Sequence, residues 1–178
     1  MSRRQLRFED VRPDFERYWQ EVQANRHPIA LLLDGVDDVR NVGALFRLAD
    51  AARLEKIYSY QTEIDLLDKK LRRVARQTEQ LTPYQHLRSR EALESLKQEK
   101  PLIGLEWTND SVPYTDFEVQ EAGYTLVIGN EERGISDEVL ELLDASVHIP
   151  MHGVKTSLNV AMATGIVTYA LLEKWLAR

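Results

Sequence analysis

The stretch Ile29-Ala30-Leu31-Leu32-Leu33-Asp34-Gly35 decides the fold. An apolar run that ends at an Asp-Gly pair is typical of a short strand buried on both faces. Asn41 follows this run and belongs to a residue type that caps helices, so we predict that it is the N-cap of a helix reaching about Arg53. Strand, loop and helix form the first structural unit.

The same alternation continues toward the C-terminus. Hydrophobic runs and turn residues predict further strands at residues 56–60, 83–86, 101–105, 124–128 and 147–149. Helices are predicted at residues 66–78 and 91–98, from an N-cap at Ser136 to about Leu143, and at 157–176. Such alternation favours an α/β fold of one domain, with a largely parallel sheet flanked by helices.

The two ends of the chain differ from this central pattern. Pro13 to Asn25 carries Phe15, Tyr18 and Trp19 at helical spacing, so residues 1–28 are predicted to be an N-terminal helical extension and residues 29–178 the main domain. The last predicted helix is apolar nearly all round. We therefore expect it to pack against both the core and a second subunit.

Composition excludes several classes of protein. The 178 residues include no cysteine, which rules out disulfides, thiolate metal sites and cysteine nucleophiles. The longest plainly apolar run, Ile29 to Leu33, is far shorter than the roughly 20 residues that span a bilayer. We expect a soluble cytoplasmic protein without a membrane segment.

Common cofactor signatures are absent. The sequence has no Gly-x-Gly-x-x-Gly after a strand, no P-loop and no His-Glu-x-x-His, so a Rossmann methyltransferase or a P-loop enzyme is disfavoured. The histidines lie on separate segments without metal-ligand spacing and are interpreted as surface or loop residues: His27, His86, His148 and His152. No metal site is predicted.

Three ordered motifs resemble those of the SpoU/TrmH-type methyltransferases of the SPOUT superfamily. The first runs from Asp34 to Arg47 and contains an Asn-x-Gly turn at Asn41, although it has Val39 where many members have proline. The second is Ile128-Gly129-Asn130-Glu131-Glu132-Arg133-Gly134-Ile135-Ser136. The third is Ile149-Pro150-Met151-His152-Gly153-Val154-Lys155-Thr156-Ser157-Leu158-Asn159-Val160-Ala161.

This resemblance implies a homodimer with a deep C-terminal trefoil knot that uses S-adenosylmethionine to methylate a ribose 2′-hydroxyl in tRNA or rRNA. The catalytic residues implied are Arg47, Asn41, Glu131, Ser157 and Asn159. The cofactor residues implied are Leu105, Gly129, Glu131, Ile149, Met151, Ser157 and Leu158.

The chemistry of the implied reaction bears on Arg47. A ribose hydroxyl is a poor nucleophile without a base or a strong positive field. Because an arginine stays protonated, we favour an electrostatic and phosphate-positioning role for Arg47 over that of a general base. The alternatives are structural: Arg47 on a solvated helix face, Asn41 or Ser157 as a simple N-cap, and Glu131 in a salt bridge.

The net charge of −6 is unusual for an RNA-binding protein, but the cations cluster. Arg3, Arg4 and Arg7 lie at the start, and the helix at residues 66–78 is expected to place Leu67 inward and its cations outward. The predicted RNA-binding residues are Arg47, Lys69, Lys70, Arg72, Arg73 and Arg76. A non-catalytic RNA-binding paralogue, an enzyme acting on an RNA base and a flavodoxin-like nucleotide-binding module are the alternative functions.

Overall fold

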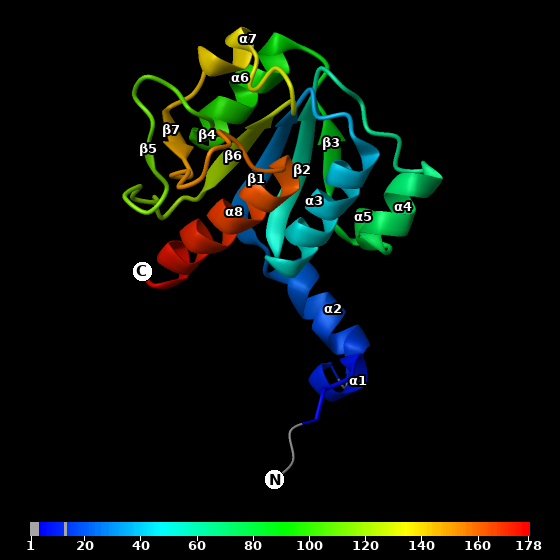
Figure 1. Cartoon of the computed structure of the whole chain (residues 1–178). Coiled ribbons are helices and arrows are strands. Elements are labelled where there is room, and N and C mark those ends of the chain that lie inside the picture. Colours follow the sequence, from blue (N-terminus) through cyan, green and yellow to red (C-terminus); the bar gives the residue numbers. More distant parts are fainter. Residues whose placement is uncertain (1–3, 13) are drawn as a thin grey trace.

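A parallel sheet forms the centre of the computed structural model, which describes residues 4–12 and 14–178 (Figure 1). In the described residues the sheet has seven strands in the order β3-β2-β1-β6-β4-β7-β5, and each neighbouring pair is parallel. The strands are β1 (His27–Asp34), β2 (Leu54–Tyr60), β3 (Tyr84–His86), β4 (Leu102–Leu105), β5 (Val112–Pro113), β6 (Tyr124–Gly129) and β7 (Ala145–His148). The predicted α/β class is confirmed.

Helices cover both faces of the sheet. Helices α3 (Val39–Ala51), α4 (Lys69–Ala75) and α8 (Val160–Leu176) pack on one face, and α6 (Arg90–Glu99) and α7 (Asp137–Leu140) pack on the other (Figure 1). Side chains alternate along β1: Leu31 joins Phe46 of α3 in one core, whereas Leu32 joins Leu93 of α6 in the other. Burial on both faces explains why β1 is apolar throughout.

The N-terminal helices project from this body (Figure 1). They are α1 (Phe8–Val11) and α2 (Phe15–Ala24), and the side chain of Asp14 caps α2 by accepting the backbone N–H of Arg17. Only Val22 of α2 is buried, and Trp19 is partly exposed. Pro13, the predicted start of this helix, and Arg3 lie outside the described residues.

The start of α3 corrects one prediction. Asp38, not Asn41, is the N-cap, because its carboxylate accepts the backbone N–H of Arg40 and the helix therefore begins at Val39. Asn41 lies in the first turn, and Gly43 lies within the helix rather than in a turn. Val39 occupies the first helical position, where proline is also accommodated, so its replacement of proline leaves the helix start intact.

The predicted helix at residues 66–78 is also wrong in its extent. It is divided into α4 and α5 (Thr78–Leu81), because Arg76 and Gln77 have φ angles of 57° and 74°, in the left-handed region that ends a helix. Leu67 precedes α4 and is 76% exposed, contrary to the inward position expected for it.

Asn159, rather than Ser157, caps α8 by accepting the backbone N–H of Met162 at 3.2 Å. Ser136 occupies the N-cap position of α7, as predicted, although its side chain makes no capping hydrogen bond. This helix ends at Leu140 rather than near Leu143.

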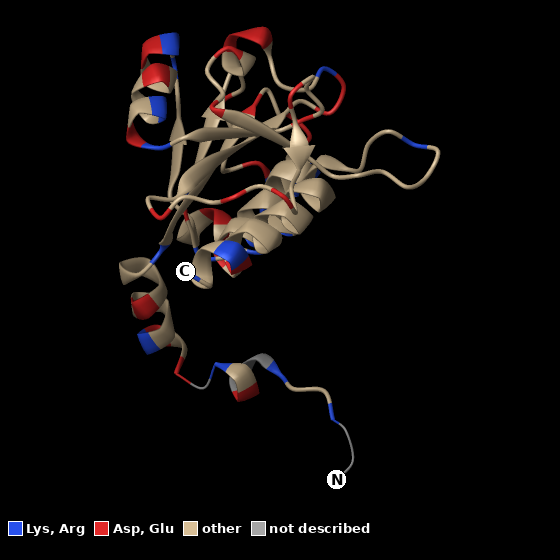
Figure 2. Cartoon of the chain, turned by 90° about the vertical axis from the view of Figure 1, so that its left-hand side faces the viewer, with Lys and Arg blue, Asp and Glu red and all other residues tan. Residues whose placement is uncertain are grey.

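Helix α8 is buried on only one side in a single chain. Val167 and Leu171 face the core, whereas Met162, Ile166 and Tyr169 are 58%, 39% and 43% exposed. Its charged residues are near the C-terminal end, as Figure 2 shows. No helix in the described part of the chain is both long and apolar enough to cross a membrane.

Candidate active site

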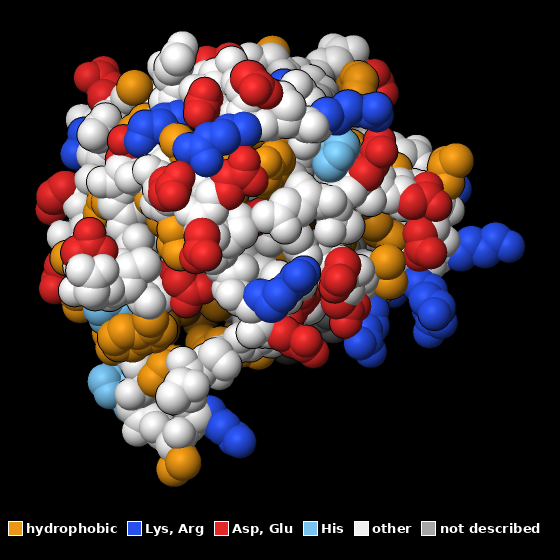
Figure 3. All heavy atoms as spheres, turned by 90° about the horizontal axis from the view of Figure 1, so that it is seen from above, with side chains coloured by type: hydrophobic (Ala, Val, Ile, Leu, Met, Phe, Trp, Pro, Cys, Tyr) orange, Lys and Arg blue, Asp and Glu red, His pale blue; other side chains and the backbone are white. Residues whose placement is uncertain are grey.

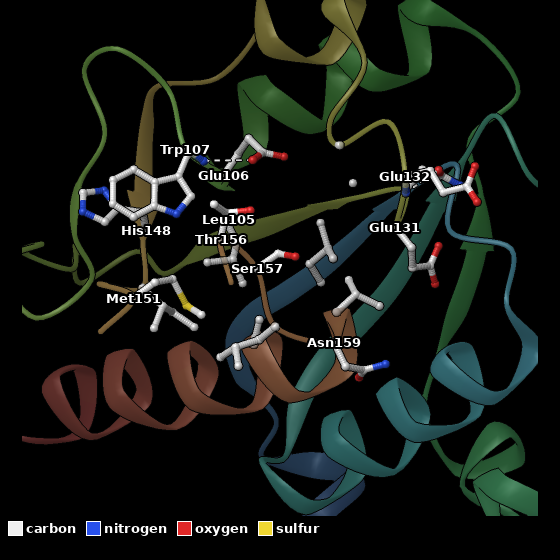
Figure 4. Close-up of a pocket in the computed structure, with 18 residues that line it drawn as sticks. Leu105, Glu106, Trp107, Glu131, Glu132, His148, Met151, Thr156, Ser157 and Asn159 are labelled. Carbon is white, nitrogen blue, oxygen red and sulfur yellow. Dashed lines mark hydrogen bonds between the residues drawn. The ribbon is translucent and has the colours of Figure 1, made fainter. Parts of the chain in front are cut away.

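A cavity of about 610 Å³ opens at the carboxyl ends of β4, β6 and β7 (Figure 4). Its walls come from the segments that follow these strands and from the first turn of α8. Ligands of open parallel sheets bind outside the carboxyl ends of the strands, so this position is the expected one for a functional site.

Every residue that the sequence implied for the cofactor lies in the wall of this cavity. Apolar Ile149 and Leu158 are half-buried there, and polar Ser157 is exposed. The full set is Leu105, Gly129, Glu131, Ile149, Met151, Ser157 and Leu158. The structure thus brings together residues that are up to 53 positions apart in the sequence, from 105 to 158.

Backbone hydrogen bonds close the loop after β6 into a tight turn. Asn130 and Gly134 exchange backbone hydrogen bonds at 3.0 and 2.9 Å, and Gly134 has a φ of 70°. A Cβ atom at Gly129 would lie 2.1 Å from the carbonyl carbon of Gly134. Close backbone approach therefore requires glycine at 129, while the left-handed conformation favours it at 134.

Three of the predicted catalytic residues form one hydrogen-bonded chain. Asn41 donates from Nδ2 to Oε1 of Glu131 at 2.6 Å, and Asn159 donates from Nδ2 to Oδ1 of Asn41 at 2.9 Å. Because Asn159 also caps α8, the chain joins α3, the loop after β6 and α8. Among the described residues Glu131 makes no ion pair, so the salt-bridge interpretation of this residue is not supported.

The other two predicted catalytic residues lie apart from this chain. Ser157 lines the cavity two positions before the α8 cap. Arg47 is exposed on α3 and does not line the cavity. It follows Asn41 by six positions and therefore points about 120° away around the helix axis. Within the described residues its guanidinium has no partner, which leaves it available to a ligand.

Sequence reasoning missed an aromatic pair at the opposite end of the cavity from Asn159 (Figure 4). The rings of Trp107 and His148 stack with centroids 3.8 Å apart and planes at 20°. Ser111 holds His148 through a 2.9 Å hydrogen bond between its Oγ and Nδ1 of the imidazole. His148 therefore lines the cavity and is also the last residue of β7. In the sequence, its place near the end of the strand predicted at residues 147–149 was the one feature that could have indicated this position.

The predicted RNA-binding cations of α4 all face solvent. Figure 3 shows basic side chains projecting on the side of the molecule where α4 lies. Arg72 is engaged with Glu79, with Nε and Oε1 3.4 Å apart and the glutamate side chain 1% exposed. The exposed set is Lys69, Lys70, Arg72, Arg73 and Arg76.

These features define a class: a parallel α/β protein whose ligand cavity is closed by loops after its strands and by an apolar terminal helix. The chain belongs to the SpoU rRNA Methylase family, whose profile matches residues 28–169. The resemblance drawn from the three motifs is therefore confirmed.

Individual relatives agree with this assignment. The chain is 30% identical over 141 residues to the 23S rRNA (guanosine(2553)-2′-O)-methyltransferase RlmP of Bacillus subtilis. The aligned region covers 79% of this chain and 56% of that relative. It thus spans little more than half the length of this relative.

Solved structures are similar along most of the chain. The A. aeolicus TrmH/SpoU tRNA modifying enzyme has a TM-score of 0.80 and 25% identity, covering 94% of this chain and 85% of the other. The SpoU methyltransferase AviRb from Streptomyces viridochromogenes, in complex with the cofactor AdoMet, has a TM-score of 0.73 and 26% identity. The match covers 84% of this chain and 61% of AviRb.

Proposed function

We propose that this protein transfers a methyl group from S-adenosylmethionine to a ribose 2′-hydroxyl of rRNA or tRNA. The observation that carries the proposal is the hydrogen-bonded chain of Asn41, Glu131 and Asn159 beside the cavity. The relative RlmP is named for 2′-O-methylation of 23S rRNA, and AviRb was solved with AdoMet.

The cavity residues fit the proposed cofactor. A volume of about 610 Å³ lies within the range of roughly 300–1,000 Å³ typical of small-molecule sites. Leu105, Ile149 and Leu158 offer apolar surface to an adenine ring, and Gly129 lines the same cavity. The free N–H groups at the start of α8, next to Ser157, suit a carboxylate. When bound, the cofactor supplies an electrophilic methyl group on a positively charged sulfur.

The protein's part in the reaction is to orient the hydroxyl. Glu131 uses Oε1 to accept the amide of Asn41, while Oε2 has no hydrogen-bond partner among the described residues. We assign Oε2 the acceptance of a hydrogen bond from the ribose hydroxyl, which would align the oxygen for attack on the methyl carbon and give the proton released in the transfer an acceptor. Asn159 keeps the Asn41 amide, and through it Glu131, in this orientation.

Cations outside the cavity complete the proposed RNA site. Arg47 stays charged and is assigned to an RNA phosphate near the reacting ribose. Lys69, Lys70, Arg73 and Arg76 are assigned to the RNA backbone farther away, where phosphate contacts position a substrate without reading its sequence. Arg72, which also faces solvent, contributes less because Glu79 neutralises it.

We also propose a cytoplasmic homodimer with a C-terminal trefoil knot, divided into an extension of residues 1–28 and a methyltransferase domain of residues 29–178. The exposed apolar residues Met162, Ile166 and Tyr169 of α8 favour an interface on that face. Sedimentation analysis tests it: Ile166→Glu should yield monomers, and a parent protein that is itself monomeric would refute the dimer.

The test of the proposed function combines binding with turnover. Calorimetry measures S-adenosylmethionine binding, and transfer of a labelled methyl group to transcripts of rRNA and tRNA is followed by digestion to nucleosides. A 2′-O-methyl nucleoside supports the proposal. A base-methylated product, or binding of RNA without any transfer, overturns it.

A blocking variant tests the cavity itself. Ala163 lines the cavity from α8, so Ala163→Trp should fill it and abolish cofactor binding. Ala51→Trp, at the exposed end of α3, is the matched control and should bind normally. Gly129 is unsuitable for this purpose, since any side chain there would collide with the backbone of its own loop.

A further inference from the structure

A second cavity, of about 280 Å³, lies outside the carboxyl ends of β1 and β6. After β1 the chain continues to α3 on one face of the sheet, and after β6 it continues to α7 on the other. Where neighbouring connections diverge in this way, a parallel sheet leaves a crevice that binds ligands. Asn130 and Gly134 line both cavities, so the loop after β6 forms part of the wall between them.

The floor of this second cavity holds a buried carboxylate with spare bonding capacity. Asp34 is 2% exposed, and its Oδ2 accepts the backbone N–H of Ser136 at 2.7 Å. Its Oδ1 and the Oγ of Ser136 are buried without a hydrogen-bond partner among the described residues. Buried polar atoms are nearly always paired, so this floor is suited to a ligand that brings hydrogen-bonding groups.

The rim adds two exposed polar side chains. Gln61 has a φ of 62°, an uncommon conformation for a residue other than glycine, and it places its amide at the cavity edge. Arg133 lies on the loop that separates the cavities. Neither side chain has a hydrogen-bond or ion-pair partner in the part of the chain that the structure describes, so both are available to a ligand.

The chemistry of this wall restricts the ligand. The carboxylates of Asp34 and Asp137 disfavour a phosphate. Within residues 4–12 and 14–178, no cluster of three or more His, Asp or Glu side chains is placed to hold a metal ion. The volume of about 280 Å³ lies near the lower limit of the roughly 300–1,000 Å³ typical of small-molecule sites, so the cavity can hold only a small ligand or one ring of a larger one. A single flat ring with donors on one edge and acceptors on another fits these properties.

Guanine has this arrangement of groups. Its ring N–H and amino group can donate to the Asp34 carboxylate, and its O6 and N7 are the acceptors that arginine recognises most often. Resting on the methyl-transfer function proposed above, we infer that the second cavity binds the guanine base of the RNA nucleotide whose ribose is placed beside Glu131. Gln61 and Arg133 are then specificity-determining residues, and Asp34 is the acceptor that selects guanine.

The nucleoside that becomes methylated reports on this cavity directly. Gln61→Ala, Arg133→Ala and Asp34→Asn are assayed with the same transcripts, together with Gln98→Ala, an exposed glutamine of α6 that serves as control. The parent should yield mainly 2′-O-methylguanosine. Each cavity variant should lose about 5- to 150-fold of the preference for guanosine, with an unchanged Kd for S-adenosylmethionine.

The outcomes separate this inference from the function on which it rests. Equal loss for all four nucleosides indicates a structural role and overturns the inference, as does parental guanosine preference in all three variants, or a parent that methylates another nucleoside. Absence of transfer by the parent refutes the proposed function itself. If Asp34→Asn fails to fold, the two exposed residues Gln61 and Arg133 still decide the question.

Discussion

Replacement of Gly43 by alanine should destabilise the protein although it adds a better helix former. Gly43 lies in α3 where that helix crosses α4. A Cβ atom there would be 2.9 Å from the backbone oxygen of Leu71 and 2.9 Å from Cβ of Val74. A backbone oxygen cannot rotate away, so α4 has to move.

The expected size follows from two opposing effects. Overpacking costs about 1–3 kcal/mol, whereas replacing glycine by alanine in a helix gains about 1 kcal/mol. The difference between these two effects is a net loss of up to about 2 kcal/mol in the free energy of unfolding. For a chain of this size Tm should fall by up to about 8 °C, measured by calorimetry at one fixed protein concentration.

Gly165→Ala is the matched comparison within α8. Its added Cβ would lie 4.0 Å from Cδ1 of Leu48, an ordinary contact. Here the helix preference acts alone and should raise Tm by about 1–4 °C. If Gly43→Ala melts at or above the temperature of the parent, the close packing of α3 on α4 does not constrain this position and the reasoning is refuted.

Two further predictions concern charge. The double variant Lys69→Ala/Lys70→Ala should reduce the magnitude of the slope of log affinity for single-stranded RNA against log salt by about 1.4. The charge-preserving variant Lys69→Arg/Lys70→Arg should retain the slope of the parent. If the alanine variant also has the slope of the parent, α4 is not part of the RNA site. The Arg40 side chain hydrogen-bonds Asp38 and lowers its pKa from 3.8 to about 2, so the cap of α3 is stabilising above pH 4 and loses its effect as the pH falls through about 2. Asp38→Ala should therefore cost about 1 kcal/mol at pH 7 and progressively less between pH 4 and pH 2 in pH-dependent unfolding, and a difference independent of pH would contradict this assignment.

The α3 cap is also relevant to the site. Asp38 fixes the first turn of α3, and this turn carries Asn41 toward Glu131. Asn159 performs the equivalent task for α8 while bonding to Asn41. The proposed catalytic chain therefore depends on the starts of two helices. The hydrogen bond between them joins Asn41 and Asn159, which are 118 positions apart in the sequence. Loss of either cap should affect activity as well as stability.

The sequence predicted the positions along the chain of every described strand except β5, and the family resemblance implied seven of the residues that line the first cavity. Apolar runs such as residues 29–33 and 124–128 mark buried parallel strands, because burial on both faces removes the polar alternation. The three motifs follow or precede such strands, and the carboxyl ends of parallel strands meet at one edge of the sheet. The resemblance to the family implied the cofactor residues from Leu105 to Leu158, and this shared edge explains why the fold brings them into one cavity.

Competition between neighbouring residues was decided only in the folded chain. Asp38 and Asn41 both suit an N-cap, and the sequence contains no feature that ranks them. The break at Arg76 and Gln77 is equally hidden, since neither residue type favours a left-handed conformation. There the packing of α3 against both α4 and α5 overrides local preference.

The sequence by itself determined the parallel α/β class, the family and the loops that carry the chemistry, because these depend on local patterns of apolar and turn residues. Only the tertiary structure decided which side chains meet. The stacking of Trp107 on His148, the hydrogen bond from Asn159 to Asn41 and that from Ser136 to Asp34 join residues distant in sequence. Such contacts arise from the position of whole strands and helices, and no local pattern specifies them.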